Sequence, residues 1–224
     1  RAGHELALVG GPVRDALLGR EVSDLDFATS ASPEQIESIV SDWADAMWDM
    51  GRDFGTIGLR KGNEQIEITT YRADSYDTDS RKPTVEFGTS LDADLARRDF
   101  SVNAMAIRLP SREFVDIYSG LDDLADRTLR TPSGPDVSFS DDPLRMMRAV
   151  RFVAQLSCEL SPDVFEAIRA MGERLTIVSA ERVRDEFSRL LTADNPVAGL
   201  RLLVDSGLAD IVIPELPALQ LERD

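Results

Sequence analysis

Short apolar runs, separated by turn residues and amphipathic stretches, fill the first third of the chain. The apolar run at 6–9 precedes a Gly-Gly-Pro turn and a short amphipathic stretch, which predicts a strand, a tight turn and a short helix. Residues 24–29 alternate polar and apolar side chains like a half-buried strand. Ser32 suits a helix N-cap and Pro33 the first helical position, so we expect a helix from there to Trp43.

Two more runs typical of strands, 56–60 and 65–71, flank a four-residue turn, which predicts a hairpin. With the earlier strands they predict a mixed sheet that carries helices on one side. Residues 73–90 contain few apolar side chains, and we expect a mobile loop excursion there.

The second part of the chain has the period of amphipathic helices. A Pro-Ser-Gly-Pro cluster at 132–135 is the best candidate for a domain boundary, and helical patterns follow it at 143–157, 162–173, 180–193 and 196–206. The pattern therefore predicts an α+β protein, with a sheet-containing domain at 1–133 and an all-α segment at 134–224.

Length and composition exclude several classes of protein. With 224 residues the chain is long enough for one large domain or two small ones. A single Cys and a single His exclude a disulfide scaffold, a Cys/His zinc site and most His-based catalysis. Because the chain has no apolar run of about 18 residues, we expect no membrane span, no secretion leader and a cytoplasmic protein.

The formal net charge of -16 argues against a generic basic nucleic-acid binder. The charge is uneven, because residues 97–151 contain 9 basic and 9 acidic side chains while the regions on either side are acidic. Almost all basic residues are Arg, which suits bidentate recognition of phosphates and bases, although a GC-rich genome would produce the same bias. The charge thus leaves local recognition of a nucleotide open, and argues against broad salt-driven RNA binding.

Asp24 and Asp26 are two residues apart on a predicted strand, so both carboxylates point to the same face. At about 5 Å and an effective dielectric constant near 20, two such charges repel by about 3 kcal/mol, a cost that a divalent cation would reverse. Magnesium takes one or two carboxylates together with substrate phosphates. Glu67 would be a third catalytic carboxylate if its strand neighbours that of Asp24. A solvated strand edge is the alternative.

The turn at Gly10 and Gly11 allows backbone N–H groups to approach a phosphate closely, and the helix that follows points its positive end to the same place. Arg14 adds a positive charge inside that helix. An ordinary strand-to-helix turn with a surface arginine is the alternative.

Charged side chains recur every three residues on one predicted helix, at Asp142, Arg145, Arg148 and Arg151. They spread over about 180° of the helix, an arc that can recognise a base edge and hold a triphosphate. A solvated face, with Asp142 only an N-cap before Pro143, is the alternative. The pair Arg97-Arg98 offers a further cationic clamp, and Asn103 a further amide donor and acceptor.

Five ordered segments contain all of these residues except Glu67. They are LVGGPVRDALLG at 8–19 with Asp24-Leu25-Asp26 after it, RRDFSVNAMA at 97–106, DIYSGLDDL at 116–124, DDPLRMMRAVRF at 141–152 and SAERVRDEF at 179–187. This series resembles the motifs of class II tRNA nucleotidyltransferases and bacterial poly(A) polymerases, in the same order, and covers most of the chain. Two positions differ, since Ser101 replaces the family's usual Thr and Asp141 its usual Glu.

The resemblance implies a nucleotidyltransferase head of the polymerase-β type at 1–133, then a helical neck and the start of a body that binds the tRNA acceptor end at 134–224. It implies that Asp24 and Asp26 hold two catalytic Mg²⁺ ions, and that the segment 179–187 braces the helix that recognises the base. The nucleotide-binding residues that it implies are Gly10, Gly11, Arg14, Arg97, Arg98, Asp99, Asn103, Asp142, Arg145, Arg148 and Arg151, with Asp142 and Arg145 on the Watson–Crick edge of ATP or CTP.

The reaction implied is attack of a tRNA 3′-hydroxyl on the α-phosphorus of CTP or ATP, with pyrophosphate as the leaving group. CCA addition to tRNA is the favoured function; a poly(A) polymerase, or an enzyme that adds only C or only A, would share the motifs. A non-catalytic RNA-binding module and a purely structural acidic domain are alternatives from other classes. Bacterial members of the family continue through a body and tail, some with an HD-type phosphohydrolase domain, so we expect this chain to be an N-terminal fragment.

Overall fold

The computed structural model describes residues 2–22, 24–49, 51–75, 84–88 and 90–218, which divide into two compact units, Arg1–Leu121 and Asp122–Asp224. This division lies earlier in the chain than the domain boundary that the sequence predicts, at 133/134. Residues 122–133 belong with the second unit because β10 (Thr128–Leu129) pairs in parallel with β11 (Glu159–Leu160).

Strands dominate the first unit. They are β1 (Leu6–Val9), β2 (Asp24–Thr29), β3 (Ala46–Trp48), β4 (Thr56–Lys61), β5 (Glu64–Thr70), β6 (Arg72–Ser75), β7 (Thr84–Phe87), β8 (Ala106–Leu109) and β9 (Phe114–Val115). Its helices are α1 (Gly11–Leu17), α2 (Pro33–Val40) and α3 (Leu91–Ala96), with 3₁₀ turns η1 (Arg52–Phe54) and η2 (Ser101–Asn103). Helix α4 (Gly120–Ala125) begins in the first unit and continues into the second.

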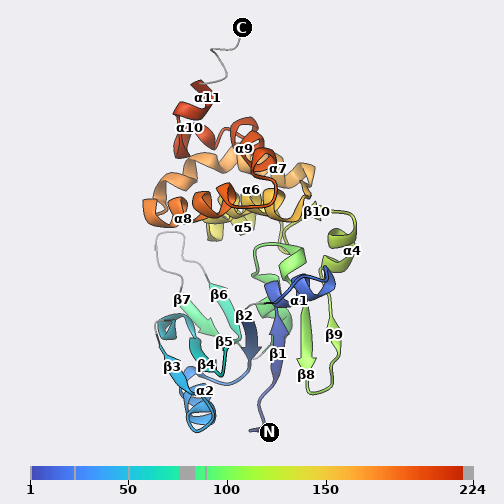
Figure 1. Cartoon of the computed structure of the whole chain (residues 1–224), viewed down its shortest axis with the longest axis vertical. Helices are drawn as coiled ribbons and strands as arrows, with labels where there is room; N and C mark the ends of the chain where they lie inside the picture. Colours follow the sequence, from blue (N-terminus) through green and yellow to red (C-terminus); the bar gives the residue numbers. More distant parts are fainter. Residues whose placement is uncertain (1, 23, 50, 76–83, 89, 219–224) are drawn as a thin grey trace. The chain divides into compact units, whose positions relative to one another are not determined.

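A sheet of seven strands, counted over the described residues, runs in the order β3-β4-β5-β2-β1-β8-β9 (Figure 1). Strands β2 and β5 are parallel, and the other neighbours are antiparallel. The prediction of a mixed sheet is therefore confirmed, as is the hairpin between β4 and β5.

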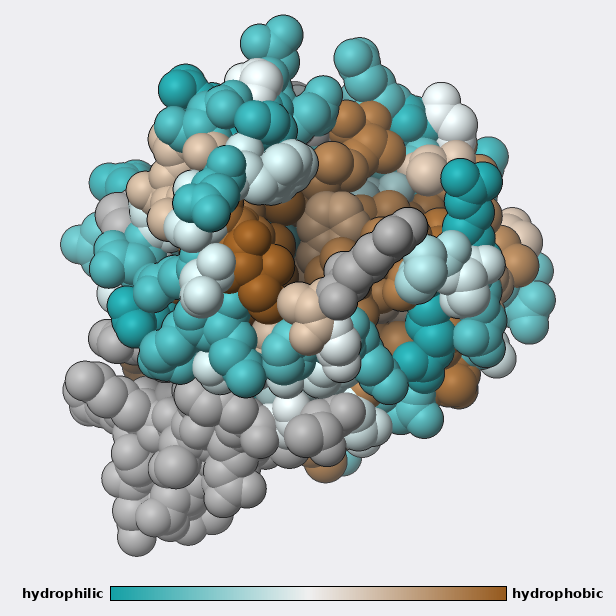
Figure 2. All heavy atoms as spheres, turned by 90° about the horizontal axis from the view of Figure 1, so that it is seen from below, coloured by the Kyte–Doolittle hydropathy of each residue, from teal (hydrophilic) through white to brown (hydrophobic). Residues whose placement is uncertain are grey.

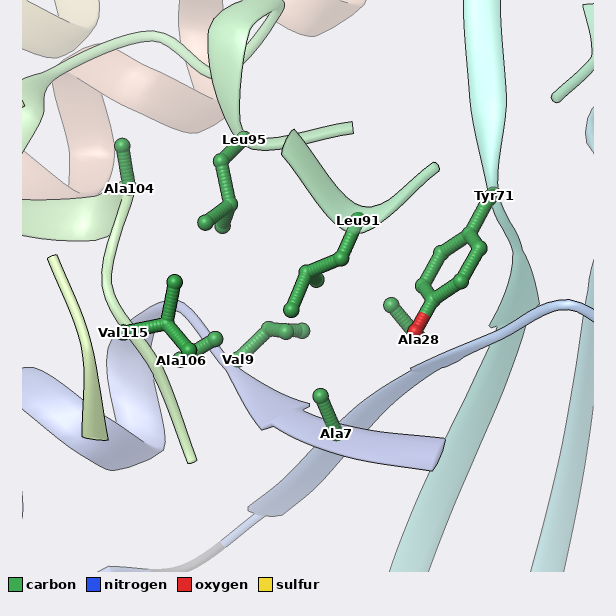
Figure 3. Packing of buried hydrophobic residues seen from close by; sticks show 9 residues of the cluster. All are labelled: Ala7, Val9, Ala28, Tyr71, Leu91, Leu95, Ala104, Ala106 and Val115. Atoms are coloured by element: carbon green, nitrogen blue, oxygen red, sulfur yellow. The ribbon is translucent and has the colours of Figure 1, made fainter. Parts of the chain in front are cut away.

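Helices pack on both faces of this sheet, so the prediction of helices on one side is wrong. On one face α2 contributes Ile36 and Val40 to a cluster with Ile57, Leu59 and Ile66. On the other, α3 places its leucines on β1, β2 and β8 in the cluster that Figure 3 shows: Ala7, Val9, Ala28, Tyr71, Leu91, Leu95, Ala104, Ala106 and Val115. Side chains alternate between faces along a strand, and β1 is apolar at every position, so both of its faces need cover.

Two local predictions need correction. Helix α2 begins with the expected Ser32 cap, in a full capping box with Gln35, but ends at Val40 rather than Trp43. Within the expected loop excursion at 73–90, β6 and β7 form an antiparallel pair. The remainder of that prediction, at 76–83 and 89, lies outside the described residues.

The second unit is mainly helical, as expected. Its helices are α5 (Pro135–Asp141), α6 (Leu144–Leu156), α7 (Pro162–Met171), α8 (Ala180–Leu191), α9 (Pro196–Asp205), α10 (Ala209–Val212) and α11 (Glu215–Ala218), with η3 (Gly172–Ile177) as a 3₁₀ turn. Helix α9 approaches α6 and α8 closely at Gly199, where an added Cβ would lie 2.2 Å from Leu190 and 3.1 Å from Ala154.

The surface carries some hydrophobic side chains. Figure 2 shows them gathered in a hollow on the face seen from below, with polar side chains around it. None of the helices in the described ranges has the length and apolar character needed to cross a bilayer.

Candidate active site

Three carboxylates lie on one face of two neighbouring strands of the first unit. Strands β2 and β5 are parallel and in register, with Asp26 opposite Glu67 and Asp24 opposite Gln65. Residues opposite each other in a sheet share a face, so Asp24, Asp26 and Glu67 point to the same side. The sequence alone left this adjacency open, and the structure confirms it.

The three negatively charged carboxylates repel one another. Burial raises the pKa of the Asp26 carboxyl above its usual value, and the charges of Glu67 and Asp24 raise it further, while Arg98 lowers it. A divalent cation would relieve the repulsion, because it favours ionised oxygen ligands.

The carboxylates of Asp24 and Asp26 fit a metal ion that takes its remaining ligands from a substrate. Within the described residues, His, Cys, Asp and Glu side chains form no group of three or more placed to hold a metal ion. Two carboxylates that point to one face suit magnesium, which completes its coordination with water and substrate phosphates.

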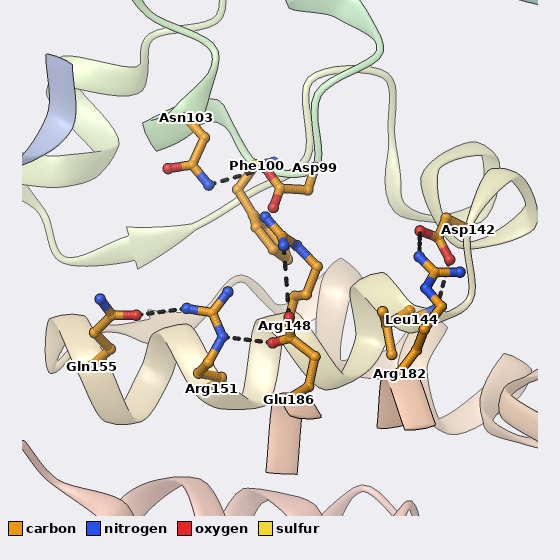
Figure 4. Close-up of polar contacts among 10 residues, drawn as sticks. All are labelled: Asp99, Phe100, Asn103, Asp142, Leu144, Arg148, Arg151, Gln155, Arg182 and Glu186. Carbon is orange, nitrogen blue, oxygen red and sulfur yellow. Dashed lines mark hydrogen bonds and ion pairs between the residues drawn. The ribbon is translucent and has the colours of Figure 1, made fainter. Parts of the chain in front are cut away.

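Arg14 lies in a buried polar network rather than on the surface. Its Nη1 donates to Asn103 Oδ1 at 2.5 Å, and its Nε and Nη2 donate to the two carboxylate oxygens of Asp15. Asn103 Nδ2 in turn donates to Asp99 Oδ1 at 3.0 Å, as Figure 4 shows. The structure therefore brings Arg14, Asn103 and Asp99 together, from motifs almost ninety residues apart.

Gly10 connects β1 to α1 with φ 73° and ψ −133°, a conformation that is essentially restricted to glycine. An added Cβ would lie 2.8 Å from Arg98 Nη1, so the guanidinium group rests directly against this glycine. The Gly10 N–H donates to the Met105 carbonyl at 3.2 Å, and this amide is therefore engaged within the fold rather than open to a phosphate.

Sequence reasoning missed Asp94, which ion-pairs with both arginines of the predicted clamp. Its Oδ1 lies 2.8 Å from Arg97 Nη2, and its Oδ2 lies 3.0 Å from Arg98 Nη2. Burial alone would raise the pKa of Asp94, but the Arg98 and Arg97 charges lower it below its usual value. The i,i+3 and i,i+4 spacing from Asp94 to the two arginines was the available signal.

In the second unit, the two predicted base-recognising side chains lie at the start of α6, and each has a partner there. Asp142 Oδ1 accepts the Leu144 N–H, and Oδ2 accepts from Arg182 Nη2 at 2.9 Å. The N-cap position of α6 is Pro143, however, so the prediction of Asp142 as the N-cap is wrong by one residue. Arg145 Nη1 donates to Ser138 Oγ at 3.0 Å.

Further along α6, Arg151 is buried and turns toward α8. Its Nε lies 2.6 Å from Glu186 Oε2, and its Nη1 donates to Gln155 Oε1 at 2.6 Å (Figure 4). Arg148 lies farther from Glu186, at 3.7 Å, and is a third exposed. The segment 179–187 thus braces α6 through Glu186 and Arg182, as predicted. Arg151 takes part in that contact and is not an exposed cation on the face of the helix.

Comparison with known proteins supports this assignment of motifs. Residues 6–130 match the family described as "Poly A polymerase head domain", and residues 158–219 match "Probable RNA and SrmB- binding site of polymerase A". The CCA-adding enzyme of Streptococcus suis is 43% identical over 206 residues, which cover 92% of this chain and 50% of that protein.

Two solved structures share the fold. One is the Bacillus stearothermophilus CCA-adding enzyme in complex with CTP, with a TM-score of 0.82 and 36% identity, covering 92% of this chain and 49% of that one. The other is a tRNA nucleotidyltransferase complexed with a primer tRNA and an incoming ATP analog, with a TM-score of 0.78 and 31% identity, covering 94% and 60%. The chain spans about half the length of the curated relatives that it matches. It belongs to the family of the poly A polymerase head domain.

Proposed function

We propose that the protein is a CCA tRNA nucleotidyltransferase, which adds CMP and AMP from CTP and ATP to the 3′ end of tRNA. The observation that carries this proposal is the register of β2 and β5, which aligns Asp26 with Glu67 and keeps Asp24 on the same face. Relatives that are CCA-adding enzymes, and related structures with CTP or with a primer tRNA and an ATP analog, support the choice of substrates.

Asp24 and Asp26 would hold the metal, which we propose is Mg²⁺. When bound there, two magnesium ions would lower the pKa of the attacking hydroxyl and neutralise charge on the phosphates. The 3′-oxygen of the RNA forms a bond to the α-phosphorus, and the bond from the α-phosphorus to its bridging oxygen breaks. Pyrophosphate and one proton are released.

The protein's own side chains position the nucleotide. Arg98 and Arg97 supply two adjacent positive charges, and Arg14 a third within the network with Asn103. Such fixed cations stabilise developing phosphate charge without reorganising during the reaction. Since Arg14 and Asn103 are buried and hydrogen-bonded to each other, their contribution is to hold α1 in place as much as to contact the triphosphate.

Base selection is assigned to Asp142 and Arg145. A carboxylate acceptor and an arginine donor fork can match the Watson–Crick edge of cytosine or adenine by reorienting. Their partners, Arg182 and Ser138, hold the two side chains at the start of α6. Three further expectations stay predictions: the division into head (1–133) and neck (134–224), the tRNA acceptor end as the partner, and a cytoplasmic location.

The decisive experiment sequences the products of a tRNA that lacks its 3′ CCA, incubated with the full-length protein, CTP, ATP and Mg²⁺. Addition of CCA supports the proposal. A run of A points to a poly(A) polymerase, addition of only C or only A to a partial enzyme, and no addition to a non-catalytic module. The D26N variant is the control for contaminating activity, because it keeps the shape of the side chain and removes the charge.

A second experiment tests the base-recognition step. We expect R145A to lose discrimination among CTP, ATP and GTP, with incorporation of all three reduced. Unchanged selectivity would assign recognition elsewhere, and the exposed Arg184 of α8 provides a matched control as R184A.

A further inference from the structure

Asp94 is a buried carboxylate placed between two arginines. It lies in α3, its side chain is fully buried, and each of its oxygens holds a different arginine. Oδ1 accepts from Arg97 Nε and Nη2 at 3.2 and 2.8 Å, while Oδ2 accepts from Arg98 Nη2 at 3.0 Å. Oδ1 also accepts the backbone N–H of Arg72, where β6 begins, at 3.4 Å. The buried carboxylate of Asp94 thus holds both guanidinium groups in place.

Arg98 links Asp94 to the candidate active site. Its Nη1 lies against Gly10, in the turn between β1 and α1. Its Nε is a buried donor without a hydrogen-bond partner among the described residues. Arg98 therefore connects the buried Asp94 to the glycine turn between β1 and α1.

A buried ion pair of this kind contributes little net stability, because desolvation of the charges offsets their attraction. Fixing a cation before the ligand arrives, by contrast, removes the entropy cost of ordering a long arginine side chain on binding. The single carboxylate orders two such side chains at once, next to the turn where a phosphate is expected.

We propose that Asp94 is a positioning residue that holds Arg97 and Arg98 as a preformed clamp for the phosphates of the incoming nucleotide. The proposal rests on the proposed function, because it takes a nucleoside triphosphate as the substrate. Asp94 itself does not contact the nucleotide; it acts through the two arginines, and its removal leaves their charge in place while freeing their orientation.

The test separates orientation from charge, and uses D94N, which keeps the shape of the side chain and removes its charge. If charge alone mattered, D94N would bind phosphate more tightly, because it makes the site more positive. We expect instead that inorganic tripolyphosphate and Mg–CTP both bind about tenfold more weakly in calorimetry, with a matching rise in KM for CTP. Binding as tight as in the unmodified protein, or tighter, would overturn the proposal.

D94E guards against a variant that fails to fold. It keeps the charge but displaces the carboxylate by one methylene, so we expect binding between that of D94N and that of the unmodified protein. D45N is the matched control, since Asp45 is an exposed aspartate paired with Lys61 in the same unit, and its neutralisation changes the net charge equally. A purely structural role would lower the melting temperature of D94E and leave its KM unchanged.

Failure of the two proposals can be told apart. If the unmodified protein incorporates CMP and AMP while both Asp94 variants bind tripolyphosphate normally, the positioning role is wrong and the proposed function stands. If the unmodified protein neither binds tripolyphosphate nor extends tRNA, the proposed function itself is wrong.

Discussion

Asp26 and Glu67 lie directly opposite each other on the parallel strands β2 and β5. The pKa of Asp26 is raised by burial, then by Glu67. A raised pKa means that the folded state binds the proton more tightly than the unfolded state, so the ionised carboxylate opposes folding at neutral pH. Without metal, the D26N variant should therefore melt at a higher temperature than the unmodified protein at pH 7.

The gain in melting temperature of D26N should shrink as the pH falls through the raised pKa of Asp26. It should vanish below the usual value of 3.8, where the folded and the unfolded protein both bind the proton. The catalytic rate of D26N, by contrast, should fall. Loss of a metal ligand removes several kcal/mol of transition-state stabilisation, or about a hundredfold and more in rate. Melting curves in EDTA and initial rates in Mg²⁺ check the two effects, and full activity in D26N would contradict the metal assignment.

Metal addition gives an independent prediction. Mg²⁺ bound at the proposed site would neutralise the repulsion between Asp24, Asp26 and Glu67, so Mg²⁺ should raise the melting temperature of the unmodified protein. The size of the rise is set by the ratio of metal concentration to Kd. The same addition should have little effect on D26N. Equal shifts in both proteins would mean that the ion binds elsewhere.

Substitution of Gly10 should disrupt the clamp. G10A introduces a Cβ 2.8 Å from Arg98 Nη1 at a positive φ of 73°. We expect lower stability together with a rise in KM for CTP, because the guanidinium group has to move. G134A is the matched control, since Gly134 also has a positive φ, 85°, but nothing lies within 4 Å of its added Cβ. It should show the backbone cost alone, of order 1–3 kcal/mol, with KM unchanged.

The local elements were predictable because they depend on neighbours in sequence. Alternation placed β2, β4 and β5 correctly, and Ser32 with Pro33 located the start of α2. The pairing of β2 with β5 was not predictable, since it joins segments about forty residues apart whose alternation is compatible with several strand orders. Helices on both faces were missed for the same reason, because alternation shows that a face is apolar but not what covers it.

The site shows the same division between local and distant contacts. The helical spacing of Arg145, Arg148 and Arg151 was correctly identified, yet spacing alone could not show that Arg151 would pair with Glu186, 35 residues later. Asp94 was missed although its spacing to Arg97 and Arg98 was visible, because a lone aspartate in a short helix is usually a solvated residue.

The amide of Asn103 connects Arg14 to Asp99, and its loss should weaken both binding and stability. In N103A the buried Arg14 Nη1 and Asp99 Oδ1 each lose a partner, at a cost of about 1–3 kcal/mol. We expect a lower denaturant midpoint and a higher KM for CTP and ATP alike. N63A, in the exposed hairpin turn, should change neither. A loss of stability without any change in KM would restrict Asn103 to a structural role.

Breaking the buried pair Arg151 and Glu186 should destabilise the second unit more than breaking an exposed ion pair, because it leaves an uncompensated buried charge. Both side chains are 8% exposed, so E186A leaves a buried guanidinium group without its carboxylate, which typically costs 3–5 kcal/mol. The neighbouring pair Arg184 and Asp185 is 70% and 62% exposed, and D185A should cost at most about 1 kcal/mol. Urea unfolding of the two variants compares a buried ion pair that joins α6 to α8 with an exposed ion pair within α8. Because α8 also holds Asp142 through Arg182, E186A should in addition relax the choice between CTP and ATP; intact selectivity in a destabilised E186A protein would show that α6 keeps its recognition geometry without this brace.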